Sequence, residues 1–306
     1  MPDIAYFGPQ GTFSEQAALA AAGPEHTLAP VATVPEALAA VRKGRADLAC
    51  VPVENSVEGA VSATMDALAV DEPLVAIAEV VLPVTFSLLV RPGLTMADVR
   101  SVASHPHALA QVQGWLATHL GDATQLASTS TAAAAVGVLD GRYDAAITAP
   151  VAADHYALDV LRTGIADVDD AVTRFLVLRR PGTLPAPTGS DRTSVAAVAA
   201  YQRTGVLAEM LTELALRGIN LSRIESRPLK GRLGEYRFYL DFDGHVAEAR
   251  VGDALAALHR RCQHVRFLGS YPKADGTPTL AVTDNADADY TAAADWLSGV
   301  RAGRTG

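Results

Sequence analysis

The sequence predicts an α/β protein in which two similar lobes are followed by a smaller domain of strands and helices. Three observations lead to this prediction. The first half contains an internal repeat, residues 179–192 are rich in proline and glycine, and residues 192–271 follow the order strand, helix, strand, strand, helix, strand. A break of this composition between two periodic regions is typical of an interdomain linker.

Composition sets the class of protein. The chain has 306 residues, of which 49% are hydrophobic and 19% charged, enough to bury a large core in two or three domains. The formal net charge is -9 and no basic stripe runs along the chain, which argues against a nucleic-acid partner. Small molecules are therefore the expected ligands.

The ends and the cysteines point to a cytoplasmic protein. The first residues, MPDIAYFGP, lack the charged and apolar regions of a secretory signal, and no apolar run approaches the length of about 18 residues that spans a membrane. Cys50 and Cys262 form no CxxC motif and no pair with histidine, so we expect no metal site. Both are predicted to be inert thiols in the core.

The internal repeat predicts the two lobes. Two segments each read as a helix, a glycine, a short buried strand and a polar loop. They are residues 34–56, VPEALAAVRKGRADLACVPVENS, and residues 131–153, TAAAAVGVLDGRYDAAITAPVAA. Gly44 and Gly141 suit the left-handed residue that ends a helix. Repeated units of this kind favour mainly parallel sheets, which bind ligands beyond the carboxyl ends of their strands. The cleft between the lobes is the expected site.

Two polar loops follow strands in the first lobe. Residues 8–18, GPQGTFSEQAA, place Thr12 and Glu15 at the spacing of a capping box, which by itself accounts for that loop. Residues 51–59, VPVENSVEG, supply Glu54, Asn55 and Ser56. Ser56 has the position to cap the helix that runs toward Leu68, whereas no structural role explains Asn55.

Two further loops bring the number of candidate site loops to four. In SHPHALAQVQGWL (104–116), Pro106 suits the first turn of a helix, Ser104 its cap, and His107 and Gln111 lie one turn apart. A histidine at such a place is more often solvated or capping than catalytic. In DAVTRFLVL (170–178), a hydroxyl and a guanidinium stand at the mouth of an apolar strand, at Thr173 and Arg174.

The second domain follows from its periodicity. One helix is indicated by Leu207, Met210, Leu211 and Leu214, with Gly218 placed to end it, and the other by Val251, Leu255, Leu258 and Cys262. EYRFYLDFDG alternates like a half-buried strand, so the βαββαβ order predicts the ferredoxin-like split motif.

Residues 272–306 read as one amphipathic helix whose Trp296, Leu297 and Val300 we expect to pack against a neighbour.

In order along residues 1–180, the segments GPQGTFSEQA, VPVENSVEG, SHPHALAQ and TRFLVL resemble those of the prephenate dehydratase family. The resemblance implies a two-lobed catalytic domain like the type II periplasmic binding proteins, crossed twice by the chain, with the active site in the cleft. It implies dehydration and decarboxylation of prephenate to phenylpyruvate in phenylalanine biosynthesis. Such a reaction requires no redox cofactor and no metal.

The resemblance assigns roles to individual residues. It makes Thr173 essential, and its hydroxyl has the right size to donate a hydrogen bond to the departing oxygen, with Asn55, Ser104 and Gln111 orienting the substrate. Arg174 either clamps a carboxylate or forms a structural ion pair. Glu54 is either an acid or a partner of Arg174, because an ionised carboxylate repels a dianion. Relatives usually have glutamine at the position of His107, whose role stays open.

The second domain is similar to the ACT regulatory domains of this family. Its Gly205-Val206-Leu207 and Glu225-Ser226-Arg227-Pro228 segments, together with Asn220, imply a phenylalanine site at a subunit interface, and hence a homodimer or homotetramer. The alternative is a purely structural role, in which Gly205 begins a helix and Arg227-Pro228 end a strand. The expected organisation is a catalytic domain at 1–180, a linker at 181–191, a regulatory domain at 192–271 and an extension at 272–306.

Two other functions stay open. An arogenate dehydratase differs only in meeting an amino group where prephenate has a keto group, and no residue here decides between them. A binding protein or amino-acid sensor with the same two-lobed shape would have no need for Thr173 beside Arg174 together with Asn55 and Gln111, nor for a regulatory domain.

Overall fold

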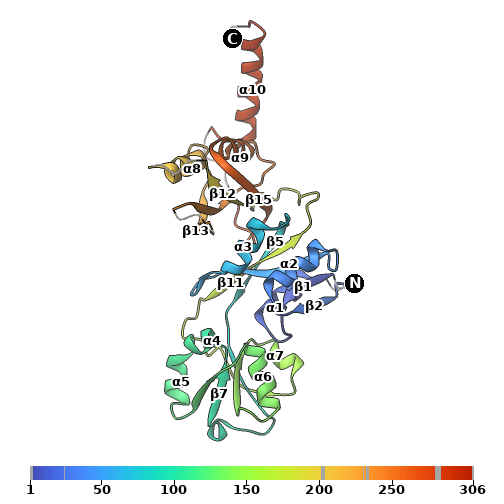
Figure 1. Cartoon of the computed structure of the whole chain (residues 1–306), viewed down its shortest axis with the longest axis vertical. Helices are drawn as coiled ribbons and strands as arrows, with labels where there is room; N and C mark the ends of the chain where they lie inside the picture. The colour runs from blue at the N-terminus through green and yellow to red at the C-terminus, as the bar shows by residue number, and fades with distance from the viewer. Residues whose placement is uncertain are drawn as a thin grey trace. The chain divides into compact units, whose positions relative to one another are not determined.

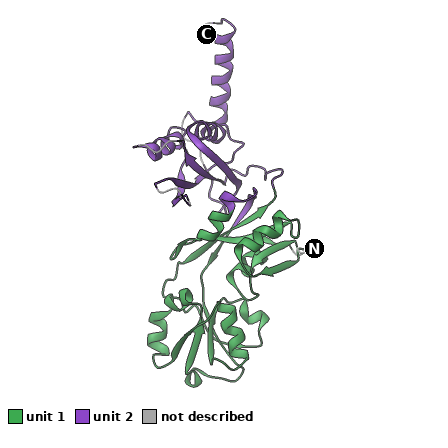
Figure 2. Ribbon diagram, viewed as in Figure 1, with its two compact units in different colours: residues 1–67, 80–180 green, residues 68–79, 181–306 purple. Residues whose placement is uncertain are grey.

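The computed structural model describes residues 3–23, 25–200, 204–229, 231, 234–279 and 284–304. The chain divides into two compact units (Figure 2). The first comprises Met1–Ala67 and Val80–Arg180, and the second comprises Leu68–Glu79 and Pro181–Gly306. Each unit is described here by itself.

The first lobe of the first unit is built on four main strands. β1 (Ile4–Phe7), β2 (Leu28–Val31) and β3 (Leu48–Asn55) are parallel in the order β2-β1-β3, and β11 (Val172–Arg179) is antiparallel to β3. The short β4 (Gly59–Ala60) also pairs with β3. The helices are α1 (Phe13–Ala21), α2 (Val34–Arg42) and the start of α3 (Ser62–Val70). Ile4, Tyr6, Cys50 and Phe175 lie in its core.

The second lobe has a five-stranded sheet in the order β10-β6-β9-β7-β8. Its strands are β6 (Ser87–Val90), β7 (Ser101–Ser104), β8 (Thr124–Ala127), β9 (Ala145–Thr148) and β10 (Asp159–Thr163). Its helices are η1 (Met96–Asp98), α4 (Pro106–Ala110), α5 (Gln113–His119), α6 (Thr131–Leu139) and α7 (Ala152–His155). Figure 1 shows α4 to α7 gathered around β7, apart from α1, α2 and β1 of the first lobe.

The internal repeat is confirmed in three dimensions. α2 and α6 each begin at a hydroxyl cap, Thr33 and Ser130, whose side chains accept from the backbone N–H three residues on. Each ends before a left-handed glycine, with φ 67° at Gly44 and 72° at Gly141. β3 and β9 follow. A residue with a Cβ is disfavoured at such φ values, so glycine sets where the chain leaves the helix for the strand.

The two-lobed architecture is confirmed, with one difference in its sheets. The chain passes between the lobes twice, and the two connections bond to each other through Val84 N to Ala171 O at 2.7 Å and Ile165 N to Phe86 O at 3.3 Å. After each crossing the chain adds an antiparallel strand, since β6 is antiparallel to β9 and β11 to β3. The sheets are therefore mixed, where the repeat alone predicted mainly parallel ones.

The second unit contains the expected βαββαβ order. β12 (Asp191–Ala199), α8 (Val206–Ala215), β13 (Leu221–Pro228), β14 (Tyr236–Asp243), α9 (Ala249–Arg261) and β15 (Cys262–Pro272) follow one another. The antiparallel strands lie in the order β13-β14-β12-β15. Met210 and Leu214 of α8 and Val251 and Leu258 of α9 are buried against this sheet. Cys262, expected on the second helix, instead begins β15, because the helix ends at Arg261.

Both cysteines are free and buried, as expected of core thiols. Burial raises the pKa of Cys50 to about 12 and that of Cys262 to about 11. A thiol with so high a pKa is almost entirely protonated at neutral pH and is a poor nucleophile. Neither sulfur is equipped for catalysis.

The segment Leu68–Glu79 belongs to the second unit, although the sequence placed it inside a domain spanning 1–180. It contains the first part of β5 (Val75–Pro83), which pairs with β15 at Ala76 and Gly269. The buried carboxylate of Glu79 forms an ion pair with Arg192 and accepts from Ala274 N at 2.9 Å. A strand from the first half of the sequence thus completes the second unit.

The extension forms the expected helix, α10 (Asp287–Arg301). Asp287 accepts from Ala249 N at the start of α9, at 2.8 Å. Within α10 only Gly299 is buried, and Trp296, Leu297 and Val300 are exposed on the single chain. Among the described residues, no helix has both the length and the apolar character needed to cross a membrane.

Candidate active site

A cavity of about 500 Å3 lies between the two lobes of the first unit. Its polar lining comes from the ends of strands and the starts of helices in both lobes: Thr12, Ser14, Asn55, Glu58, His105, His107, Gln111, Thr129, Ser130, Thr131 and Thr173. The lining therefore includes Asn55, Gln111 and Thr173, three of the residues that the sequence singled out.

Thr173 and Asn55 are brought together by the antiparallel pairing of β11 with β3. Asn55 is the last residue of β3 and Thr173 the second of β11, and the two are direct register partners. Asn55 Nδ2 donates to Thr173 Oγ1 at 2.8 Å. Residues 118 positions apart in sequence thus form one hydrogen-bonded pair in the cavity wall.

The neighbouring backbone fixes the orientation of the Asn55 amide. Its Oδ1 accepts from Val57 N at 2.8 Å and from Glu58 N at 2.9 Å. Since those two contacts require an oxygen, the NH2 group must face Thr173. The Thr173 oxygen therefore acts as an acceptor toward Asn55, which leaves its O–H proton available for another acceptor in the cavity.

A second polar group joins the lobes at the cavity wall. Glu58, in the loop before β4, contacts His107 Nδ1 at 2.8 Å and accepts from Gln111 Nε2 at 3.4 Å. His107 lies in α4 and Gln111 directly follows it. Neither Glu58 nor His105 was among the site residues inferred from the sequence. Glu58 is revealed by its contacts across the cleft, and His105 by its place in the cavity lining.

His105, and not Ser104, caps α4. Its Nδ1 accepts from His107 N at 3.3 Å. Burial, followed by the positive charge of His107, holds the pKa of His105 below its ordinary value, and the carboxylate of Glu58 opposes that shift. Ser104 is fully buried, donates to Ile147 O at 2.6 Å and is outside the cavity lining. Its position supports a structural role.

Glu54 and Arg174 also lie outside the cavity lining. They occupy opposite positions on β3 and β11, where Arg174 Nε and Nη2 donate to Glu54 Oε2 at 3.3 and 3.1 Å. Side chains alternate between the faces of a strand, so Glu54 and Arg174 point away from the side occupied by their neighbours Asn55 and Thr173. Of the two readings left open by the sequence, this geometry favours the structural ion pair.

The glycine-rich loop after β1 is held by a buried carboxylate. Thr12 caps α1 as expected, but Glu15 does not complete a capping box. Its carboxylate accepts from Gly11 N at 2.6 Å and from Tyr6 Oη at 3.1 Å, and contacts His155 of the second lobe at 2.9 Å. Burial and the nearby Glu15 charge raise the pKa of Tyr6 well above its ordinary value. The loop is thereby fixed where it borders the cavity.

Ser56 has a different role from the cap that the sequence suggested. Its Oγ accepts from Val172 N at 2.9 Å, and its own N–H donates to Val172 O at 2.9 Å. α3 begins six residues later, at Ser62. Ser56 therefore ties the loop after β3 to the start of β11, next to Thr173.

The first turns of two helices border the cavity. The start of α1 contributes Thr12, Phe13 and Ser14 to the lining, and the start of α6 contributes Thr129, Ser130 and Thr131. Helix N-termini favour anions because their backbone N–H groups and dipoles point outward. The second set was missed in the sequence, although Ser130 before the alanine-rich helix carries the signature of an N-cap.

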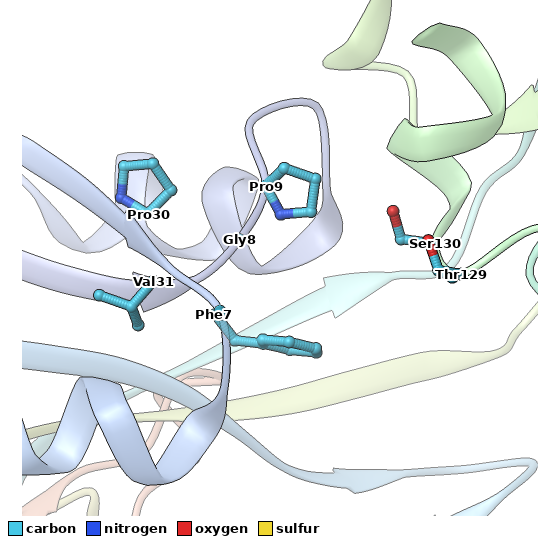
Figure 3. A pocket seen from close by; sticks show the side chains of 8 residues that line it. Phe7, Gly8, Pro9, Pro30, Val31, Thr129 and Ser130 are labelled. Atoms are coloured by element: carbon cyan, nitrogen blue, oxygen red, sulfur yellow. The ribbon is translucent and has the colours of Figure 1, made fainter. Parts of the chain in front are cut away.

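An apolar wall completes the cavity. The rings of Phe13 and Phe86 meet edge to face at 5.5 Å, and Val61 and Val84 lie in the same lining. A smaller cavity of about 410 Å3 adjoins it and shares Phe7, Gly8, Thr129 and Ser130. Figure 3 shows Phe7, Gly8 and Pro9 facing Thr129 and Ser130 across this space.

The regulatory candidates lie at two places in the second unit. Gly205 is the N-cap of α8 with φ 85°, and Val206 and Leu207 form the first turn of that helix. β13, the edge strand of the ferredoxin-like sheet, ends with Glu225, Ser226, Arg227 and Pro228. Within this segment Arg227 donates to Glu225 at 3.4 Å. Asn220 precedes this strand and donates to Asp243 at 3.0 Å. Within the described ranges, no cluster of three metal-binding side chains occurs.

Comparison with known proteins gives one consistent family. Residues 4–183 match the family described as "Prephenate dehydratase". A curated prephenate dehydratase from Amycolatopsis methanolica is 60% identical over 306 residues, covering 99% of each chain. The crystal structure of prephenate dehydratase in complex with L-Phe from Arthrobacter aurescens superposes with a TM-score of 0.92 at 45% identity, covering 97% of this chain and 99% of that one. GqqA, described as a quorum quenching acylase, is more distant, with a TM-score of 0.78 at 33% identity over 88% of this chain and 97% of that one.

Proposed function

The chain belongs to the prephenate dehydratase family, and we propose that the cavity between its lobes is where prephenate is converted to phenylpyruvate. The observation that carries this assignment is the Thr173–Asn55 pair, in which the amide holds the threonine oxygen and leaves its proton free. The chemistry of the substrate explains why such a donor is needed.

Prephenate is a dianion that carries two carboxylates and a ring hydroxyl. In the reaction a ring C–C bond to one carboxylate breaks, its electron pair enters the ring, and the C–O bond to the hydroxyl breaks. Carbon dioxide and hydroxide leave, and the hydroxide takes up one proton to become water. Aromatisation of the ring supplies much of the driving force, so the protein must position the dianion and stabilise the departing oxygen.

Thr173 is the donor to that oxygen in this proposal. An unperturbed hydroxyl is a weak acid, so its role is a positioned hydrogen bond, with the consumed proton coming ultimately from solvent. Gln111 faces the same cavity and orients the substrate. The first turns of α1 and α6 provide partial positive charge for carboxylates, and the wall formed by Phe13 and Phe86 receives the ring.

The function is tested by following phenylpyruvate formation from purified prephenate, with arogenate in a parallel reaction. Thr173→Val keeps the shape of the side chain and removes the hydroxyl, so we expect kcat to fall about 100-fold or more while folding is retained. Thr173→Ser should recover part of the rate. Near-normal turnover by the valine variant would contradict the role of the hydroxyl, and faster turnover of arogenate would reassign the substrate.

The structure gives no support for an acylase reaction at Thr173. An acylase of the serine or threonine type needs a base that removes the hydroxyl proton of its nucleophile. The partner of Thr173 Oγ1 is an amide NH2, which donates a hydrogen bond and cannot accept that proton. A donor role fits dehydration better than nucleophilic attack.

The regulatory part of the proposal is that phenylalanine binds between the second units of two subunits and lowers activity from there. β13 carries Glu225 to Pro228 and lies at the end of the sheet, where β14 is its one neighbour among the described strands. A second copy placed along this edge would build a homodimer with a ligand site shared across a two-fold axis, and two such dimers would build a homotetramer. The L-Phe complex of the Arthrobacter aurescens protein supports phenylalanine as the ligand.

A further inference from the structure

The glycine-rich loop between β1 and α1 contacts the second lobe at a place outside the cavity lining. Tyr156, which directly follows α7, donates from its Oη to Gln10 O at 2.9 Å. The preceding residue, His155, contacts the buried carboxylate of Glu15 through Nε2 at 2.9 Å. All four residues lie outside the cavity lining, so these contacts join the two lobes without belonging to the substrate site.

Gly11 makes the close approach of the loop and α7 possible. Its φ is 82°, and a Cβ at this position would lie 2.8 Å from Tyr156 Cε2 and 3.3 Å from Ala152 Cα. Non-bonded carbon atoms are most stable about 3.5 to 4.0 Å apart, so a side chain here would push the loop away from α7. From its own lobe, the loop is held by Glu15, which accepts from Gly11 N at 2.6 Å.

The docked loop is continuous with the wall of the cavity. Gly8 and residues 12–14 line the cavity, and Gln10 and Gly11 lie between them in the chain. A shift of the loop away from α7 would therefore move the first turn of α1, which faces the cavity. The fit of the loop against Tyr156 accordingly couples the approach of the two lobes to the shape of the site.

We propose that Tyr156 is a positioning residue, which latches the two lobes in their closed form through Gln10 and Gly11 and so prepares the cavity for prephenate. This inference rests on the proposed function, because it requires prephenate to bind in this cavity. Tyr156 touches no reacting atom and acts through the loop. The two crossings of the chain, bonded to each other between Val84 and Ala171, provide the hinge about which the lobes open.

The latch acts on the fraction of protein that is closed. A ligand that requires the closed form binds with an apparent affinity reduced by that fraction. The Tyr156 hydroxyl contributes one hydrogen bond to the closed form, and the loss of such a bond shifts the equilibrium about two- to tenfold. KM for prephenate should rise by up to this factor. In contrast, kcat should change little, because the Thr173–Asn55 pair is untouched and saturating substrate closes the lobes.

Steady-state kinetics of the full-length enzyme test the proposal. Tyr156→Phe removes the hydroxyl and keeps the ring. The matched control is Tyr143→Phe, because Tyr143 packs in the core of the same lobe and lies outside the cavity lining. We expect Tyr156→Phe to raise KM about two- to tenfold with kcat nearly unchanged, and the control to behave as the wild type. A lower melting temperature with an unchanged KM would show a purely structural role and overturn the proposal.

A double variant tests whether the ring and the loop act as one unit. In Gly11→Ala the added methyl group meets the ring of Tyr156, so KM should rise more than in Tyr156→Phe. The loop is then already displaced, and adding Tyr156→Phe to Gly11→Ala should change KM little further. Two effects that simply multiply would mean that the residues act independently, which would contradict the latch.

Calorimetry gives a readout that does not depend on turnover. Prephenate is titrated into Thr173→Val and into the double variant Thr173→Val/Tyr156→Phe. We expect the dissociation constant of the double variant to be higher by the same factor as KM. Equal affinities, or a wild-type-like KM with a reduced kcat in Tyr156→Phe, would overturn the latch. Failure of the wild type to turn over prephenate would instead overturn the proposed function.

Discussion

At the scale of single residues, the orientation of the Asn55 amide is what makes Thr173 a donor. Asn55→Asp keeps the size of the side chain but replaces the NH2 group by an oxygen. The threonine hydroxyl would then donate to that carboxylate, and its proton would no longer be available to the substrate. We expect kcat to fall about 100- to 10,000-fold with little change in the unfolding midpoint, measured by prephenate turnover and thermal denaturation.

The ion pair behind this site allows a contrasting prediction. Glu54→Gln removes one charge of the pair with Arg174, whose side chain is only 9% exposed. Since a buried guanidinium loses a charged partner, we expect a loss of about 1–3 kcal/mol in the free energy of unfolding. Activity at a temperature where the variant is folded should stay within a few-fold of the wild type. A loss of kcat comparable to that of Thr173→Val would return Glu54 to the catalytic group.

At the scale of elements, substitution of two glycines in the second unit tells the effect of backbone conformation on stability from the effect of side-chain packing. Gly205 has φ 85° and no atom within 4 Å of an added Cβ, so Gly205→Ala tests the backbone alone. We expect it to cost about 1–2 kcal/mol of stability. Gly252 lies inside α9, where an added Cβ would meet Val246 O at an ordinary 3.6 Å. Gly252→Ala should stabilise the protein by about 0.5–1 kcal/mol.

Both glycine variants are measured by chemical denaturation of the full chain. If the two substitutions changed stability in the same direction, the left-handed conformation would not be the reason for glycine at position 205. The same variants also bear on regulation, because Gly205 belongs to the proposed phenylalanine site. Gly205→Ala should weaken the response to phenylalanine, whereas Gly252→Ala should leave it unchanged.

At the scale of the whole molecule, the exchange of Leu68–Glu79 affects how regulation can be tested. Removal of residues 188–306 would take away Arg192, Ala274 and the β15 partner of Ala76, and leave the carboxylate of Glu79 without them. The removal would also expose the backbone of β5 at Ala76, which pairs with Gly269, and an uncovered strand edge favours aggregation. We therefore expect this truncated protein to be destabilised and prone to aggregation, which thermal denaturation and light scattering would show.

The response to phenylalanine is accordingly best measured on the full chain. We expect inhibition of wild-type turnover that is lost or weakened in Glu225→Gln, with KM for prephenate in the absence of phenylalanine unchanged. Coupling of about 1–3 kcal/mol between sites corresponds to roughly 5- to 150-fold changes in affinity. Inhibition that remained strictly competitive and unaffected by substitutions at β13 would place the inhibitor in the catalytic cavity.

The sequence by itself determined the local features of this protein. The glycines at 44 and 141 and the periods of two and 3.6 residues are properties of neighbouring positions, so they revealed the repeated lobes and the βαββαβ order. Helix caps were less well predicted, since Thr12 is the expected cap of α1 but Ser56 and Ser104 make other contacts. The resemblance to the family followed from four short segments and their order along the chain, one of which contains Thr173. Contacts between distant segments were decided only by the tertiary structure. Antiparallel β11 sets Thr173 against Asn55, Glu58 meets His107 across the cleft, and Leu68–Glu79 joins the second unit. A strand's hydrophobic pattern limits its register, but which distant strand it pairs with depends on the faces that are buried together in the folded protein.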